Sequence, residues 1–347
     1  NFGDETGAVA ALKDAGVPIL LQAYPDELDK MGPSLRRDAF CGKFSIMDVF
    51  CQYGVPFTAL QPQTVHPQSP AFAQNWAGFA GNGRVANGMR EFTVGAIGAR
   101  TTAFKTVRFD ELALQRHGIT TETYDLSMII SRVRALTGGD ARVRDKIAQQ
   151  AGYADFSLVP PAPQETLAKL AVVLEQLVAE CRLDALALRC WSELETELKI
   201  SPCVVVGWLG DSGVPCACEV DVCNAVAMRA LGLASDRAAT CLDWNNNYGN
   251  DPDRCILFHC GPVPQSLMAG PGQVIDNPIL AKALGAGCAW GSNVGRIAPG
   301  PMTYASCKTE QGRLAFFLGQ GEITGDPIAA DFFGCAGVAH IANLQDK

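Results

Sequence analysis

Acidic residues gather at two places near the middle of the chain, and their types and spacing favour chemistry. Glu219 and Asp221 lie two residues apart, so both would point to the same face of an extended segment. Two carboxylates that close together can share a divalent cation or raise each other's pKa. Glu193 marks the second place. The alternative is a solvated acidic surface, since Glu195 and Glu197 near Glu193 would make that segment an ordinary polar helix face.

The elements around these acids are expected to bring them together. The apolar pattern of residues 185–189 predicts a buried strand. Glu193 would then follow the carboxyl end of a strand, where α/β folds bind their ligands. The apolar run 203–209 predicts a second strand, which is bounded by Pro202 and Pro215. Glu219 and Asp221 then follow a strand as well, and all three acids face one cleft.

The order of elements predicts an α/β fold with two Rossmann-like units, followed by a β-rich, barrel-like C-terminal domain. The phrase Gly-Val-Pro followed by an apolar segment occurs at residues 16–18 and again at 54–56, as in alternating α/β units. After residue 203, glycine and proline become dense and short apolar runs are separated by turn signals. We therefore expect domains at residues 1–88, 89–203 and 204–347, with a pocket between the last two.

The composition excludes several classes of partner. A net charge of -8 argues against a nucleic-acid partner, which needs a basic surface. No apolar run approaches the ~20 residues of a membrane helix and no basic leader opens the chain, so we expect no membrane partner and a cytoplasmic protein. The 14 cysteines are scattered through apolar contexts, which predicts reduced core residues and no disulfide network.

Four other features have both a functional and a plain structural interpretation. Residues 95–98 follow a strand but lack the third glycine of the dinucleotide fingerprint, which leaves a nicotinamide oxidoreductase as a weaker alternative. Arg100 is a candidate substrate contact or a surface ion-pair partner. His259 is a candidate contact to a sugar hydroxyl or a structural histidine. Residues 243–248 have the composition of a sugar-binding loop, although we favour an ordinary turn.

A set of ordered motifs then resembles a known family. The chain resembles the L-fucose/L-arabinose isomerase family, and its fucose-isomerase-like members most closely. The resemblance spans essentially the whole chain and rests on the order and spacing of these motifs: Arg189-Cys-Trp-Ser-Glu193, Pro202-Cys, Asp211-Ser-Gly-Val-Pro215, Cys218-Glu219-Val-Asp221, Phe258-His259-Cys-Gly-Pro262 and Gly334-Cys-Ala-Gly-Val-Ala.

This resemblance implies an aldose–ketose isomerase that uses Mn²⁺ or another divalent cation held by two acids and a histidine. By motif position Glu193 matches the first acid, while the second falls at Asp221 in the fucose-type pattern and at Glu219 in the arabinose-type pattern. The family's histidine lies in a His-His segment close to the C-terminus, whereas this chain stops at Lys347, soon after His340. We therefore expect that both termini are truncated, so that residues 1–88 are the later part of the first domain and 204–347 are incomplete. Trimers or hexamers are also implied.

The chemistry of the acids agrees with an aldose–ketose isomerase. Moving a carbonyl between C1 and C2 of a sugar requires a proton to leave one carbon and reach its neighbour through an enediol, and two carboxylates suit that task. A divalent cation on O1 and O2 would stabilise the enediolate charge. We expect Glu193 to be ligand and base, Asp221 to be ligand and acid, and Glu219 to be a neighbouring ligand. The alternative is a non-catalytic sugar-binding or regulatory protein on the same scaffold.

Overall fold

The computed structural model describes residues 5–347 and divides the chain into two compact units, Asn1–Asn87 and Gly88–Lys347. Both sides of residue 203 therefore belong to the same unit. No helix within residues 5–347 has the length and apolar character needed to cross a membrane.

The first unit is a small α/β structure. Its two strands are parallel, and α2 makes the connection between them, as parallel strands require. Val9, Phe50 and Val55 form its buried core. The elements are α1 (Glu5–Leu12), β1 (Leu20–Ala23), α2 (Ala39–Gln52), β2 (Thr58–Thr64) and α3 (Pro70–Gly88), the last of which ends at the boundary between the units.

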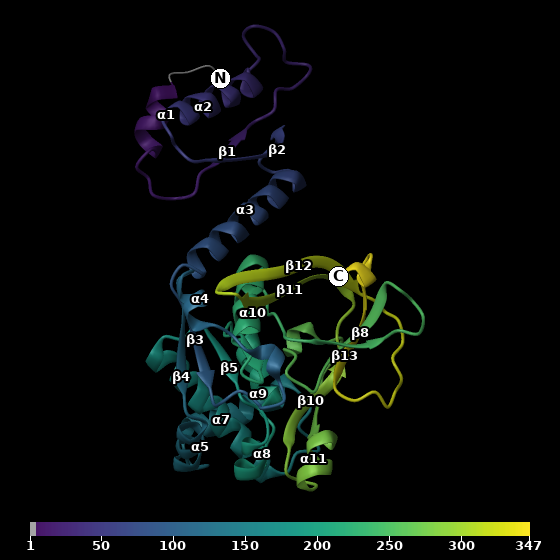
Figure 1. The fold of residues 1–347 in the computed structure, drawn as a ribbon. Coiled ribbons are helices and arrows are strands. Elements are labelled where there is room, and N and C mark those ends of the chain that lie inside the picture. The colour runs from purple at the N-terminus through teal and green to yellow at the C-terminus, as the bar shows by residue number, and fades with distance from the viewer. Residues whose placement is uncertain (1–4) are drawn as a thin grey trace. The chain divides into compact units, whose positions relative to one another are not determined.

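The second unit begins with a parallel sheet that has helices on both faces (Figure 1). The strands lie in the order β4-β3-β5-β6, and every neighbouring pair is parallel. They are β3 (Phe92–Ile97), β4 (Ile119–Tyr124), β5 (Ala185–Leu188) and β6 (Cys216–Cys218). The parallel α/β architecture expected for this part of the chain is therefore present.

Side-chain alternation in β5 explains why both faces of the sheet are covered. Leu186 and Leu188 point to one face and pack with residues of α5, α7 and α9. Ala185 and Ala187 point to the other face, where their small side chains leave room for α10. The helices of the unit are α4 (Glu111–Gln115), α5 (Leu126–Ala135), α6 (Ala141–Tyr153), α7 (Pro161–Cys181), α8 (Glu193–Leu198), α9 (Cys203–Asp211), α10 (Val222–Ser235) and α11 (Pro278–Leu284).

The last third of the chain forms a mainly antiparallel sheet of seven strands. Its path runs β11-β12-β13-β10-β9, and β7 and β8 branch from β13. The predicted β-rich region is therefore present, whereas a barrel is not confirmed, because the pairing leaves β11, β9 and β7 as ends. The strands are β7 (Asp243–Asn247), β8 (Arg254–His259), β9 (Gln273–Asp276), β10 (Trp290–Arg296), β11 (Gly300–Glu310), β12 (Arg313–Ile323) and β13 (Cys335–His340).

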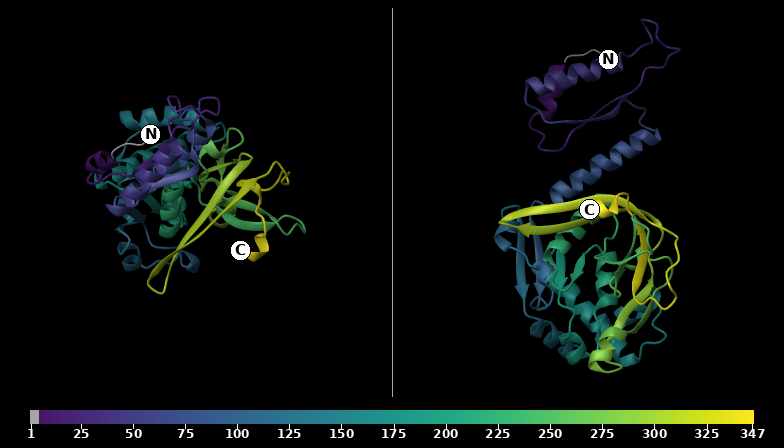
Figure 2. Two further views of the ribbon diagram at one scale, coloured as in Figure 1. Left: turned by 90° about the horizontal axis from the view of Figure 1, so that it is seen from above. Right: turned by 45° about the vertical axis from the view of Figure 1, so that its right-hand side comes forward.

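A long hairpin of β11 and β12 is the most extended part of this sheet (Figure 2). Its two-residue turn, Gln311 and Gly312, has positive φ angles of 51° and 73°, as a type I′ turn requires. The hairpin packs against α10 and thereby joins the antiparallel sheet to the α/β part of the unit.

The expected strand at residues 203–209 is wrong, because this run begins the helix α9. Almost every residue of the run is buried, so it shows no periodicity that separates a buried helix from a buried strand. The parallel sheet continues beyond residue 203 into β6.

Candidate active site

A cavity of about 560 Å³ lies where the carboxyl end of β6 meets β7, β8 and β11. Its volume is that of a small-molecule site, and the edge beyond parallel strands is the usual place for one. Glu219 and Asp221 reach it from the turn after β6. Asp243 reaches it from the start of β7 and His259 from the end of β8. All of these residues belong to the second unit.

The turn between β6 and α10 brings the two carboxylates to this cavity. Glu219 and Val220 have φ angles of 65° and 62°, in the left-handed region that a β-branched residue such as valine rarely adopts. The turn is held by the Val220 N–H, which donates to the Leu188 carbonyl at 3.3 Å, and by the Asp221 N–H, which donates to the Cys218 carbonyl at 3.1 Å. Backbone strain of about 1–3 kcal/mol per residue is typical of functional sites.

Asp221 is buried and well supplied with hydrogen bonds. It is the N-cap of α10: Oδ1 accepts from the Asn224 backbone N–H at 2.9 Å and Oδ2 from the Asn224 side-chain amide at 2.7 Å. Burial raises the pKa of Asp221, while the hydrogen bonds from Asn224 act in the opposite direction. The charge of Asp243 raises this pKa further.

Glu219 is the acid whose proton equilibrium lies nearest neutral pH. Burial raises the pKa of Glu219 to about 7, and the charges of Asp243 and Asp221 contribute to this rise. A carboxyl group with such a pKa exists in both protonation states at neutral pH. It can therefore accept a proton from a bound molecule and return it.

His259 is a neutral hydrogen-bonding group at the cavity. Its side chain is buried, and burial lowers its pKa. Nδ1 accepts a hydrogen bond from the Cys260 backbone N–H at 2.9 Å, which assigns the ring proton to Nε2. His259 thus offers an N–H donor rather than a positive charge.

Two of the candidate residues are not among those that line the cavity. Both carboxylate oxygens of Glu193 accept hydrogen bonds from Arg189, at 2.6 and 2.8 Å, because α8 begins four residues after this arginine. The guanidinium of Arg100 donates to the carbonyls of Thr101 and Phe104 at 2.9 and 3.1 Å. These hydrogen bonds stabilise the loop at residues 100–104.

The solvated face expected for residues 195 and 197 is confirmed for Glu197 and wrong for Glu195. Glu197 is exposed and forms an ion pair with Arg134 at 2.6 Å. Glu195 is 0% exposed, and neither of its carboxylate oxygens has a hydrogen-bond partner. Burial raises the pKa of Glu195 to about 8, so its neutral form predominates at pH 7.

Comparison with known proteins matches the start of the chain to a described family. Residues 1–90 match the family described as fucose/sulfoquinovose isomerase, N-terminal domain. The resemblance to fucose isomerases is confirmed. Sulfoquinovose isomerase from Alkalicoccus urumqiensis is 28% identical over 106 residues, which are 30% of this chain and 24% of that protein. Its counterpart from Clostridium sp. (strain MSTE9) is 24% identical over 202 residues, 58% of this chain and 45% of that protein.

The chain spans less than half the length of these curated relatives in the matched regions. Within residues 5–347, no group of three His, Cys, Asp or Glu side chains is placed to hold a metal ion. Glu193 is paired with Arg189, and both oxygens of Asp221 accept from Asn224. The described side chains therefore do not form a three-ligand metal centre as they are arranged.

Sequence reasoning missed several residues of this cavity. The composition of residues 243–248 favours an ordinary turn, yet Asp243 begins β7 and lines the cavity. Asn277 also lines it and caps α11, and a helix-start signal was visible because Asn277 directly precedes Pro278. Trp191 lines the cavity too and packs edge-to-face on Phe104, with ring centroids 5.3 Å apart.

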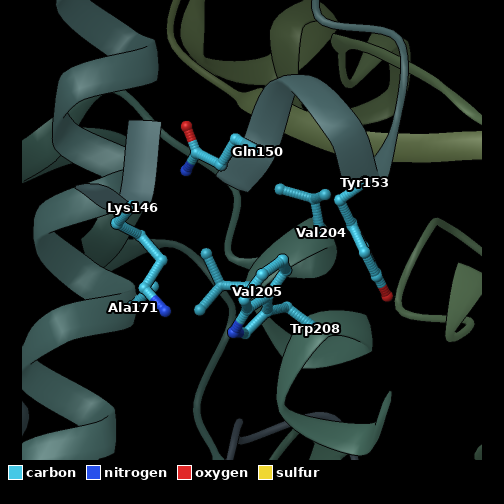
Figure 3. Close-up of a pocket in the computed structure, with 7 residues that line it drawn as sticks. All are labelled: Lys146, Gln150, Tyr153, Ala171, Val204, Val205 and Trp208. Carbon is cyan, nitrogen blue, oxygen red and sulfur yellow. The ribbon is translucent and has the colours of Figure 1, made fainter. Parts of the chain in front are cut away.

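A second and much smaller cavity, of about 10 Å³, lies among α6, α7 and α9 (Figure 3). Lys146 lies over the ring of Trp208, 4.5 Å from its centroid, and is paired with Glu175 at 2.7 Å. The Trp208 indole N–H donates to the same carboxylate at 2.8 Å. The buried ammonium group of Lys146 therefore has its partners within the helix layer, which indicates a structural role.

Proposed function

We propose that this chain carries the proton-transfer site of an aldose–ketose sugar isomerase. The observation that carries the proposal is Glu219, a carboxyl group with a pKa near neutral beside Asp221 in a cavity of about 560 Å³. The similarity to fucose and sulfoquinovose isomerases supports the reaction class.

In the proposed reaction, Glu219 removes the proton from C2 of the open-chain aldose. The electrons of that C–H bond form the C1–C2 double bond of an enediolate as the C1 carbonyl oxygen becomes negative. The Nε2–H of His259 is a donor for this oxygen, in the manner of an oxyanion hole. Return of the proton to C1 and transfer of the O2 proton to O1 give the ketose. We assign the base to Glu219 rather than Glu193 because Arg189 holds Glu193.

Asp221 supports this reaction through its charge and position. Asn224 holds its carboxylate in place at the cavity, and the adjacent negative charge keeps the pKa of Glu219 high. The Mn²⁺ implied by the resemblance remains a prediction. The trimeric or hexameric state and the cytoplasmic location also remain predictions.

The decisive experiment is an assay of ketose formation with the full-length protein. The panel contains sulfoquinovose, the substrate named for the relatives, together with L-fucose and L-arabinose, each with and without Mn²⁺. Formation of a ketose, detected by NMR, supports the isomerase. Saturable sugar binding without turnover would favour the non-catalytic alternative. A nicotinamide oxidoreductase is not favoured, since β3 runs into a loop rather than a helix N-terminus.

A further inference from the structure

Two cysteines meet beside the cavity. Cys203 is the first residue of α9 and is buried, while Cys260 follows β8 and lines the cavity. Both are free thiols, and their sulfur atoms lie 3.6 Å apart. We propose that Cys203 and Cys260 form a redox modification site, at which hydrogen peroxide or a related hydroperoxide closes a reversible disulfide.

The surroundings of Cys203 favour a thiolate. Its sulfur contacts the Ser201 hydroxyl at 3.2 Å and accepts from the Ser292 hydroxyl at 3.8 Å. It also lies at the N-terminus of a nine-residue helix, where the backbone dipole stabilises negative charge. The hydrogen bond with the Cys260 thiol, together with those from Ser201 and Ser292, lowers the pKa of Cys203 to about 7, although burial acts in the opposite direction. The neighbouring thiolate raises the pKa of Cys260, so the pair shares one proton at neutral pH.

The position of Cys260 gives the pair access to a small oxidant. Cys260 is partly exposed at the cavity, whereas Cys203 is 1% exposed behind it. The Cys203 thiolate takes the proton of Cys260. The Cys260 thiolate then attacks a peroxide oxygen, so that an S–O bond forms, the O–O bond breaks and hydroxide leaves. The Cys203 thiol attacks the sulfenic sulfur, the S–S bond forms and water leaves.

Closure would change the cavity. The sulfur atoms must approach from 3.6 Å to about 2.05 Å, which draws Cys260 toward α9. Cys260 also contacts His259, because its backbone N–H donates to Nδ1 and its sulfur lies 3.4 Å from the same nitrogen. Oxidation would therefore remove the Cys260 thiol proton from the surroundings of His259 and shift the ring at the cavity wall.

The test is disulfide mapping of the full chain and does not depend on activity. The reduced protein is treated with hydrogen peroxide, its remaining thiols are alkylated under denaturing conditions, and it is digested without reductant for mass spectrometry. We expect a peptide pair that links Cys203 to Cys260, lighter by two hydrogen atoms than the reduced peptides, which dithiothreitol separates. It should be absent from Cys203→Ser and Cys260→Ser and retained in Cys288→Ser, a partly exposed cysteine that does not line the cavity.

Two other thiol pairs make the test discriminating. Cys190 hydrogen-bonds with Cys218, and Cys223 with Cys307. Linkage within either of these pairs in place of Cys203 to Cys260 would overturn the proposal. Full alkylation of both Cys203 and Cys260 after peroxide has oxidised other cysteines would overturn it as well. Because the mapping is made on the unmodified chain, it decides the matter even if a serine variant does not fold.

Discussion

Asp221 and Glu219 lie on one turn but have different surroundings. Asp221 receives two hydrogen bonds from Asn224, whereas burial and two nearby carboxylates raise the pKa of Glu219. The difference gives the site one anchored charge and one group that exchanges its proton near neutral pH. This division of roles, and not the mere number of acids, suits the cavity to proton transfer.

The first prediction concerns the pH dependence of turnover. A base acts in its ionised form, so kcat/KM should rise about tenfold per pH unit below the Glu219 pKa of about 7 and become level above it. The measurement is an initial-rate profile of the unmodified protein with the aldose that it converts. A flat profile across pH 6 to 8 would count against Glu219 as the base.

The second prediction concerns Glu195 and stability. Burial raises the pKa of Glu195 from 4.5 to about 8, so the folded state binds this proton more tightly than the unfolded state. The contribution is fully present below the unfolded pKa and is lost as pH rises toward 8, by roughly 1.4 kcal/mol per pH unit. Urea unfolding at pH 5 to 9 should show this fall, and Glu195→Gln should remove it.

Glu197→Gln is the matched control for that experiment, since Glu197 lies on the same helix but is exposed. Equal pH dependence in the unmodified chain and in Glu195→Gln would contradict the assignment of this proton to Glu195. The sequence did not distinguish the two acids, because α8 is only six residues long and its burial depends on what packs against it. A short acidic pattern does not show which of its residues will be buried by tertiary packing.

At the scale of elements, α10 fixes the second carboxylate. Asp221 caps this helix, so the same side chain serves both the helix terminus and the cavity. We predict that Asp221→Ala lowers the free energy of unfolding by about 1 kcal/mol, while Asp221→Asn lowers it by only a few tenths, because asparagine is an equally good N-cap. Thermal or urea unfolding measures both. Equal losses in the two variants would show that the cap contributes little.

Elements near the site were predictable where their pattern was local. The apolar run at residues 185–189 predicts the strand before Glu193, and this strand is present as β5. The helix α9 was not found, because a run buried on all sides looks the same in either conformation. Asp243 was missed because its place at the cavity depends on the pairing of β7 with β8, a long-range arrangement.

Within the second unit, β10 and the segment before α9 approach so closely that their backbones leave no room for a side chain between them. Gly291 has a φ of 134°, and a Cβ atom there would lie 2.0 Å from the Ser201 carbonyl. Ser201 in turn donates its N–H to the Trp290 carbonyl at 2.8 Å. This close approach ties β10 to the segment before α9, beside the proposed thiol pair.

We predict that Gly291→Ala lowers the free energy of unfolding by about 2–4 kcal/mol, since the backbone must shift where β10 meets the segment before α9. Gly152→Ala is the control, because Gly152 lies in α6, no atom lies within 4 Å of the place its Cβ would take, and alanine favours helix. Chemical unfolding measures both changes. A Gly291→Ala variant as stable as the unmodified chain would contradict the proposed tight junction.

The measurement that tests the account most directly follows exchange of the C2 proton of the aldose with solvent deuterium, by NMR, in the full-length protein. We predict that Glu219→Gln lowers the exchange rate by about 10²- to 10⁴-fold, while Glu193→Gln, whose native carboxylate is held by Arg189, retains most of it. Circular dichroism of both variants controls for folding. A folded Glu219→Gln protein that exchanges at the unmodified rate, with exchange lost in Glu193→Gln, would contradict the central claim and restore the role of base to Glu193, as its sequence position predicts.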